Sequence, residues 1–336
     1  MFNILKSFKR TIFWKWFLLL FLSPLYNFFW KYVINFHAKF LGFFWSLKKN
    51  DFFDLKDKNY LKIKDNENIL SLANDLNNFC SENFLEKSRN KMRSNKKWTN
   101  ELFQDLPEDL RKRIIDFASS NLIVTTATKY LGVFPILSRI YFYHNIVNQE
   151  NANEEASQMW HKDGMGYRGL DFFIPVTDID ESNGPLFFSK KDNPLGAFSK
   201  IEHAIKNPKH GERNKISNKE FEKLHKDEEI DSIIGPKGSC LIVDSYNCYH
   251  KGGFIKEGER LMLRIAFDTV DSIIVNLDDE QYGSDEVFYY DKKHKKDVDN
   301  RYLRFLYFKR SKLIKNLKLP EKLLRFYQFF HYKINN

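Results

Sequence analysis

The chain has 336 residues, of which 43% are hydrophobic, and its formal net charge at pH 7 is +10. This length supports one main domain with helical additions, and the three cysteines, Cys80, Cys240 and Cys248, form no pattern typical of a disulfide framework. The composition therefore favours a reducing compartment, and we expect a cytoplasmic protein. The sequence contains no P-loop, glycine-rich dinucleotide fingerprint or internal repeat, which argues against those nucleotide-binding and repeat classes.

The N-terminal segment, residues 1–50, is basic and aromatic. It contains eight Lys or Arg residues and no acidic residue, and Ile12–Trp30 holds three of the six tryptophans. The uncharged stretch after Lys15 is shorter than the roughly 20 apolar residues of a spanning helix, and it contains Pro24. We therefore favour an interfacial segment that associates peripherally with an anionic membrane surface. A cleaved or spanning segment, and an arm packed on its own domain or on a second copy, stay open.

The main domain is expected over residues 51–300, and helices should come first in it. Residues 50–66 are polar and charged and predict a linker. Apolar residues recur at helical spacing from Glu67 to Phe79, and Pro107–Tyr130 predicts a second helix with proline in its first turn and Gly132 at its end. Such helices typically support one face of a β-sheet.

Runs rich in β-branched and aromatic residues predict strands in the second half of this domain. The main ones are Ile136–Val147, Leu170–Val176, Ser239–Asp244 and Arg260–Phe267. A charged insertion, Ser189–Glu229, interrupts these strands. We expect the histidines of the insertion on the surface, and the insertion itself is a candidate lid.

The C-terminal tail, residues 301–336, contains ten Lys or Arg residues against the single Glu321, and its helical periodicity predicts basic amphipathic helices divided at Pro320. The two ends thus carry +8 and +9, which leaves 10 − 17 = −7 for residues 51–300. This asymmetry predicts an anionic partner. A membrane surface is favoured over nucleic acid, because the N-terminal aromatic residues are contiguous and no nucleic-acid motif is visible.

The strongest chemical signal is the run Trp160-His-Lys-Asp163 together with the distant His250. Residues two apart in a strand share a face, so His161 and Asp163 would point at one place, and His250 would complete a facial triad. Two histidines and one carboxylate are the ligands of non-haem Fe(II) in oxygenases. A second His-x-Asp pair begins at His225, but it lies in a charge-dense stretch without strand alternation and is interpreted as solvated.

Four segments resemble the phytanoyl-CoA dioxygenase family of Fe(II)- and 2-oxoglutarate-dependent oxygenases. They are Gln158–Asp163, Leu170–Asp178, Glu181–Leu186 and Gly238–Ser245, the last leading to His250. The resemblance covers about residues 120–270. It implies an α+β protein whose core is a double-stranded β-helix, or jelly roll, supported by helices and flanked here by the helical basic and aromatic extensions.

The resemblance also implies the roles of single residues. His161, Asp163 and His250 would bind iron, and Arg260, which opens the last strand, would bind the distant carboxylate of the co-substrate 2-oxoglutarate. An arginine suits this task because its planar guanidinium grips a carboxylate with two hydrogen bonds and stays charged. Arg264 lies four residues later on the same strand face and is the rival for this role.

The same resemblance implies hydroxylation of an unactivated C–H bond with dioxygen. The carboxylate of Asp163 favours hydroxylation over halogenation, since halide can occupy the vacant position in related enzymes that lack this carboxylate. The segment Ser189–Asn193 departs from the family pattern, which usually has a Pro-Gly-Ser-His-like sequence there, so substrate preference does not transfer. A lipid, a membrane-linked glycan precursor or a small metabolite would all be compatible as substrate.

Two other functions stay open on the sequence alone. One is a non-catalytic, membrane-associated binding protein on the same jelly-roll scaffold, because a fold does not imply an activity. The other is a cupin-like metal protein that does not use 2-oxoglutarate. The complete triad and Arg260 favour the dioxygenase over both, and the oligomeric state is not predicted.

Overall fold

The structure is a computed structural model that describes residues 39–40, 42–43, 51–55, 58–94, 98–132, 135–147, 156–163, 169–190, 215–245 and 248–268. The predicted basic tail and, apart from residues 39–40 and 42–43, the predicted N-terminal arm lie outside the described residues.

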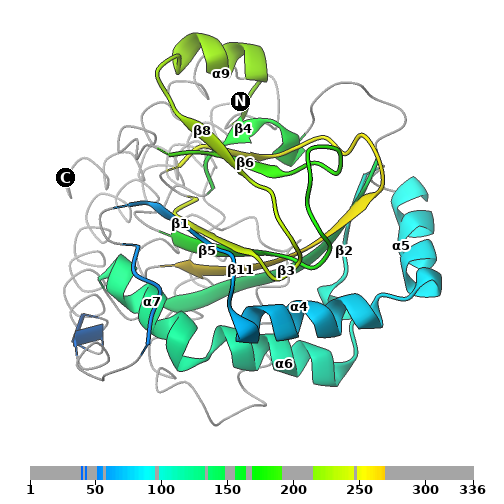
Figure 1. The fold of residues 1–336 in the computed structure, drawn as a ribbon, viewed down its shortest axis with the longest axis horizontal. Helices are drawn as coiled ribbons and strands as arrows, with labels where there is room; N and C mark the ends of the chain where they lie inside the picture. The colour runs from blue at the N-terminus through cyan, green and yellow to red at the C-terminus, as the bar shows by residue number, and fades with distance from the viewer. Residues whose placement is uncertain are drawn as a thin grey trace, which may run out of the picture.

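Two antiparallel sheets face each other and form the centre of the molecule (Figure 1). The larger sheet has the strand order β1 (Tyr60–Ile63), β9 (Cys240–Val243), β5 (Gly169–Pro175), β11 (Glu259–Asp268), β3 (Ile136–Ile146) and β2 (Thr99–Glu101). The smaller sheet has the order β7 (Lys215–Ile216), β4 (Trp160–His161), β10 (His250–Gly252), β6 (Leu186–Ser189) and β8 (Ile230–Ile233). Helices and antiparallel sheets are segregated, which makes this an α+β architecture.

Most consecutive strands of the chain lie in opposite sheets. From β3 to β6 the chain alternates between the larger and the smaller sheet at every strand, and from β8 to β11 it alternates again. As a result the larger sheet contains the successive neighbours β3, β11, β5 and β9. The smaller sheet contains the successive neighbours β4, β10, β6 and β8. This winding brings β4 beside β10, although the two strands are far apart in the sequence.

Helices cover the outer face of the larger sheet (Figure 1). They are α4 (Glu67–Phe79), α6 (Glu108–Ala118) and α7 (Asn121–Leu131), while α5 (Glu82–Ser94) lies against β2. Both faces of the larger sheet are buried, as the alternation of side chains along β11 illustrates. Leu261 and Leu263 pack in the core under the helices, whereas Met262 packs between the two sheets. Among the described helices, none has the length and apolar character needed to cross a membrane.

The prediction of a helix from Glu67 to Phe79 is confirmed, and the Asn66 side chain caps it by accepting the Ile69 N–H. The single helix predicted from Pro107 to Tyr130 is wrong, since α6 ends at Ala118 and α7 begins at Asn121. Serine residues favour helix ends, and the pair Ser119-Ser120 separates the two helices. Gly132 ends α7 as predicted, with a left-handed φ of 69°.

The prediction that residues 50–66 form a linker is also wrong. Strand β1 extends the larger sheet by pairing with β9, and Leu55 is buried in the core. The polar composition of this segment reflects an edge position, because Lys62 forms an ion pair with Asp231 of β8 at 2.6 Å and so links the two sheets.

Part of the predicted insertion belongs to the domain itself. Strand β7 pairs with β4, and helix α9 (Asn218–Leu224) packs the buried side chain of Phe221 against Trp160 at a ring-centroid distance of 4.2 Å. The rest of the insertion, residues 191–214, lies outside the described residues, so the lid hypothesis for Ser189–Glu229 stays a prediction.

Candidate metal centre

The two histidines of the predicted triad lie opposite each other on adjacent strands. His161 ends β4 and His250 begins β10, and they are direct partners in the antiparallel register. Their ring centroids are 4.3 Å apart. His250 is buried and the His161 side chain is 12% exposed, so both imidazoles are largely shielded from solvent.

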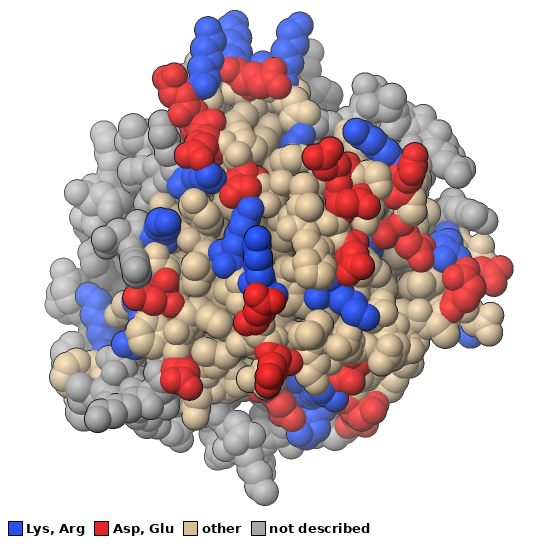
Figure 2. Space-filling view, in the orientation of Figure 1, with Lys and Arg blue, Asp and Glu red and all other residues tan. Residues whose placement is uncertain are grey.

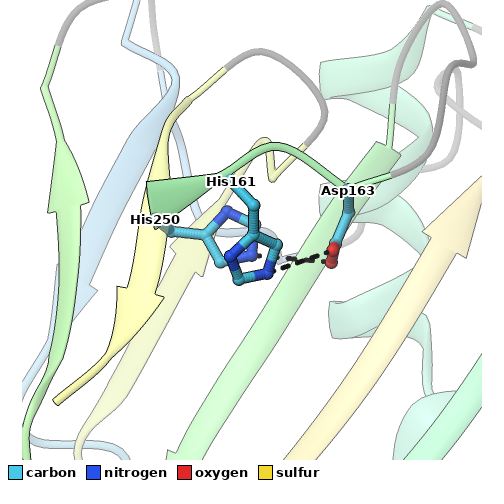
Figure 3. Close-up of side chains that lie close together, drawn as sticks. All are labelled: His161, Asp163 and His250. Carbon is cyan, nitrogen blue, oxygen red and sulfur yellow. Dashed lines mark ion pairs between the residues drawn. The ribbon is translucent and has the colours of Figure 1, made fainter. Parts of the chain in front are cut away.

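Asp163 lies just beyond the strand that carries His161. We expected both residues in one strand, but β4 contains only Trp160 and His161, so strand alternation does not place this carboxylate. Its position depends instead on a long-range contact, in which the Asp163 N–H donates to the Ser245 carbonyl at 2.8 Å. Figure 3 shows the three side chains pointing toward one another.

The ligand atoms of the triad are close enough to share one cation. The distance from His161 Nε2 to Asp163 Oδ1 is 3.6 Å, as is that from His250 Nε2 to Asp163 Oδ2, and all three ligand atoms lie within 4.8 Å of one another. Ligand atoms that each lie about 2.1 Å from a metal at right angles are about 3 Å apart, so binding would draw the two histidine–carboxylate pairs together by about 0.6 Å and the widest pair by more. Among the described residues this is the one group of three or more such side chains.

Backbone carbonyls orient both imidazole rings. Nδ1 of His161 lies 2.7 Å from the Met159 carbonyl, and Nδ1 of His250 lies 3.3 Å from the Cys248 carbonyl. A carbonyl only accepts hydrogen bonds, so Nδ1 carries the proton in each ring and the lone pair of Nε2 faces the shared centre. This is the tautomer that metal-ligating histidines adopt.

Arg264 contacts the third ligand directly. Its guanidinium forms an ion pair with Asp163 Oδ2, and it also binds Asp171 through Nε at 3.1 Å and through a terminal nitrogen at 2.9 Å. Burial alone would raise the pKa of the Asp163 carboxyl, but the Arg264 guanidinium and the neighbouring histidines outweigh burial and hold this pKa well below its usual value. Asp163 is therefore a ready anionic ligand at neutral pH.

Arg260 has a different environment. It is buried, and its guanidinium donates to the Gly184 carbonyl and to Asn145 Oδ1, the latter at 3.0 and 3.3 Å. Among the described residues this guanidinium forms no ion pair with a carboxylate, and burial lowers the Arg260 pKa to about 10. A cation that stays charged at neutral pH is thus buried among neutral acceptors, whereas Arg264 already holds two carboxylates.

Several residues around the centre were not anticipated from the sequence. Asn145 orients Arg260, Asp171 orients Arg264, and the Ser245 hydroxyl donates to Asp171. Asp171 is the one charged residue of the apolar strand β5, which is a local signal, whereas β3 also contains Arg139 and His144, so nothing local singled out Asn145.

The second His-x-Asp pair does not join a metal centre among the described residues. The expectation of a solvated surface position is nevertheless wrong for His225, which stacks on Phe221 at 4.7 Å and lies 4.8 Å from the ring of Tyr249. Its Nδ1 lies 2.7 Å from Glu228, and its side chain is 13% exposed. His225 is thus a packed residue on the outer face of the smaller sheet.

The chain matches no protein-family model and no curated protein. It is similar to EctD from S. alaskensis, solved with 2-oxoglutarate and 5-hydroxyectoine, at 14% identity and a TM-score of 0.42 over 65% of this chain and 74% of that one. It is similar to the non-heme alpha ketoglutarate dependent epimerase SnoN from nogalamycin biosynthesis at 13% identity and a TM-score of 0.39, over 64% and 80% of the two chains. It is also similar to HygX from Streptomyces hygroscopicus, solved with nickel and 2-oxoglutarate bound, at 10% identity and a TM-score of 0.36, over 63% of this chain and 84% of that one. Because these similarities are low, a functional assignment depends on the residues of this chain.

Proposed function

We propose that the protein is an Fe(II)- and 2-oxoglutarate-dependent dioxygenase of the phytanoyl-CoA dioxygenase type that hydroxylates an unactivated C–H bond. The observation that carries this proposal is the combination of two sites. A His161, Asp163 and His250 centre has the ligand set of non-haem iron oxygenases. On the same inner side of the sheets, the buried Arg260 donates to neutral oxygens and has no carboxylate partner among the described residues.

The strand order supports a double-stranded β-helix as the scaffold. Eight strands, β3 to β6 and β8 to β11, wind through the two facing sheets with the neighbour relationships that two Greek keys produce. Such a jelly roll leaves the space between its sheets open at one end, and the triad residues come from the smaller sheet and the turn that follows β4.

The three ligands fit a divalent cation with room for further ligands. Each imidazole presents Nε2, and Asp163 can use one oxygen for the metal while Arg264 contacts the other. Three ligands on one face of an octahedral ion leave positions for a bidentate keto acid and for dioxygen. When bound, Fe(II) and 2-oxoglutarate together supply the oxidising chemistry of hydroxylation, in which the keto acid is decarboxylated to succinate.

Arg260 would hold the distant carboxylate of 2-oxoglutarate. A buried guanidinium without a counterion is energetically unfavourable, and a carboxylate ligand would remove this cost while forming charge-assisted hydrogen bonds. Asn145 would fix the orientation of the guanidinium while leaving part of it available to the ligand. The carboxylate partners of Arg264 make that residue a poorer choice for this role.

Apolar side chains would limit access of water to the centre. The Phe173 ring lies 6.4 Å from the His250 ring, and Phe173 belongs to the same buried cluster between the sheets as Cys248 and Met262. A dry environment strengthens the interactions of the charged ligands and suppresses side reactions. The carboxylate of Asp163 further favours hydroxylation over halogenation.

A lipid or membrane-linked substrate and a peripheral location at an anionic membrane are part of the proposal. On the face shown in Figure 2, basic and acidic side chains of the described residues are intermixed, so this face presents no field of a single sign. The support for membrane association is therefore the basic, tryptophan-rich sequence of residues 1–50 and the basic tail.

The direct test is anaerobic titration of the purified protein with Fe(II) and 2-oxoglutarate. We expect the weak visible charge-transfer band of a keto acid chelated to Fe(II), followed by substrate-dependent succinate formation when oxygen is admitted. Metal binding with no effect of 2-oxoglutarate would favour the cupin-like alternative. A stable chelate that never yields succinate with any candidate lipid, glycan or metabolite would favour the non-catalytic binding protein.

A further inference from the structure

A closed ring of largely buried contacts holds Asp163, whose side chain is 19% exposed, beside Arg264, whose side chain is 13% exposed. The carboxylate of Asp163 pairs with Arg264, Arg264 pairs with Asp171, and Asp171 accepts a hydrogen bond from the Ser245 hydroxyl. The Ser245 carbonyl then accepts the Asp163 N–H at 2.8 Å, which closes the ring. Three residues thus hold both the backbone and the side chain of one metal ligand.

The members of this ring come from three adjacent parts of the larger sheet. Asp171 lies on β5, Arg264 lies on β11, and Ser245 follows β9, while β9, β5 and β11 are consecutive neighbours. Asp171 is 1% exposed and Ser245 is fully buried. Removing one partner from such a buried network leaves uncompensated charge, so the arrangement has little freedom to shift.

The ring also fixes how the Asp163 carboxylate faces the two histidines. Arg264 contacts Oδ2, which lies 3.6 Å from His250 Nε2, while Oδ1 lies 3.6 Å from His161 Nε2. Asp163 lies beyond the end of β4, so the alternation of side chains along a strand does not fix the direction of its carboxylate. The larger sheet therefore supplies the orientation that the two-residue strand β4 cannot.

We propose that Arg264, Asp171 and Ser245 are positioning residues that set the affinity of the His161, Asp163 and His250 centre for a divalent metal ion by fixing the orientation of Asp163. This inference rests on the proposed function only for the identity of the centre. It assigns Arg264 the role of orienting Asp163 and leaves Arg260 as the residue that anchors the keto acid.

Geometry and charge predict different results for substitutions in the ring. If only net charge mattered, Arg264→Gln would strengthen metal binding, Asp171→Asn would weaken it, and Arg264→Lys would leave it unchanged. If orientation matters, all three weaken metal binding, because a lysine cannot bridge two carboxylates and an asparagine cannot hold the guanidinium as firmly. Loss of such supporting contacts typically lowers metal affinity about 10- to 100-fold.

The experiment uses the full-length protein and Co(II) as the metal probe. Affinity is measured by calorimetry, and the visible absorption of bound Co(II) reports the ligand geometry. The variants are Arg264→Lys, Arg264→Gln and Asp171→Asn, with Ser245→Ala as the mildest change. Arg89→Lys and Arg89→Gln are matched controls, since Arg89 also bridges two carboxylates, Glu82 and Glu259, away from the centre.

We expect Arg264→Lys and Asp171→Asn to lower Co(II) affinity about 10- to 100-fold and to change the shape of the Co(II) spectrum, with a smaller loss for Ser245→Ala. The Arg89 variants should keep both the affinity and the spectrum. Wild-type affinity and spectrum in Arg264→Lys would overturn the proposal, as would tighter binding by Arg264→Gln. If a variant of Arg264 or Asp171 fails to fold, the Co(II) affinity and spectrum of Ser245→Ala test the proposal in its place. Failure of the wild-type protein itself to bind Co(II) would contradict the metal centre and the proposed function together.

Discussion

His161 and His250 are direct cross-strand partners on β4 and β10, although they lie in distant parts of the sequence. The register of these two strands therefore sets the distance between the two imidazoles. A slip of one residue would turn one ring to the outer face of the sheet. On that outer face, the preceding residues Trp160 and Tyr249 both pack against Phe221 of α9, which stabilises the register that the metal centre needs.

Replacing either histidine should abolish the centre. His161→Ala or His250→Ala removes one of three ligands, so we expect loss of the charge-transfer band of the anaerobic complex with Fe(II) and 2-oxoglutarate. His225→Ala is the matched control, because His225 belongs to the other His-x-Asp pair and packs against Phe221. Loss of the band in His225→Ala with retention in His161→Ala would place the metal centre at the His225 pair.

Arg260→Ala should weaken 2-oxoglutarate binding far more than metal binding. Truncating one partner of a buried, hydrogen-bonded charge pair typically costs about 2–5 kcal/mol, which corresponds to about 30- to several thousand-fold in affinity. Binding of 2-oxoglutarate is measured at saturating Co(II), so that any change in metal affinity is removed from the comparison. If Arg260→Ala binds the keto acid normally and Arg264→Ala does not, the anchor is Arg264.

The sequence predicted the three candidate metal ligands because their signal is local. His161 and Asp163 are two residues apart, and His250 follows a recognisable strand. The reason given for Asp163 was nevertheless wrong, since the short strand β4 ends before it. The residues that orient Asp163 come from other strands, and which side chains meet across a sheet depends on a register that spacing along the chain does not reveal.

The fold shows the same division between local and long-range information. Helix α4 was predicted correctly because the apolar spacing that indicates it is a local signal. The break between α6 and α7 was missed because apolar residues continue across the serine pair that separates the helices. Strand β1 resembled a linker because it lies at the edge of the sheet and its four residues are all partly exposed, and only its pairing with β9 identifies it.

Glu259 should make stability depend on pH in the acidic range. Hydrogen bonding to His144, followed by contacts with Arg89, lowers the Glu259 pKa from its usual 4.5 to about 2. A lowered pKa in the folded state adds stability that is present above pH 4.5 and is lost as the pH falls toward 2. Because this side chain is partly exposed, we expect a contribution of only about 1 kcal/mol.

The variant Glu259→Gln tests this contribution by urea unfolding at several pH values. Its free energy of unfolding should fall below that of the wild type at pH 6, and the difference should shrink as the pH approaches 2. A constant difference between pH 6 and pH 2.5 would mean that ionisation of Glu259 does not stabilise the fold.

Phe221→Ala should destabilise the protein and loosen the metal centre. Phe221 is 3% exposed and stacks on Trp160, so truncation should lower the free energy of unfolding by about 3 kcal/mol. Since Trp160 and Tyr249 directly precede the two histidines, Co(II) affinity should also fall. Ile234→Ala is the control, because Ile234 is 46% exposed and should change stability by less than about 0.5 kcal/mol. If Phe221→Ala is clearly destabilised but binds Co(II) with unchanged affinity, α9 does not support the metal centre.

The N-terminal arm should bind anionic membranes. Residues 1–50 contain eight basic and no acidic residues, and each basic residue near an anionic surface contributes on the order of 1 kcal/mol. Tryptophan side chains favour the headgroup region, so salt should weaken binding without removing it. We expect the full-length protein to float with vesicles that contain phosphatidylserine more than with neutral vesicles, and deletion of residues 1–48 should remove most of this association while Co(II) binding is kept.

Equal absence of the full-length protein from both kinds of vesicle would contradict membrane association. If the same deletion then lowered the melting temperature, the arm would instead pack on its own domain.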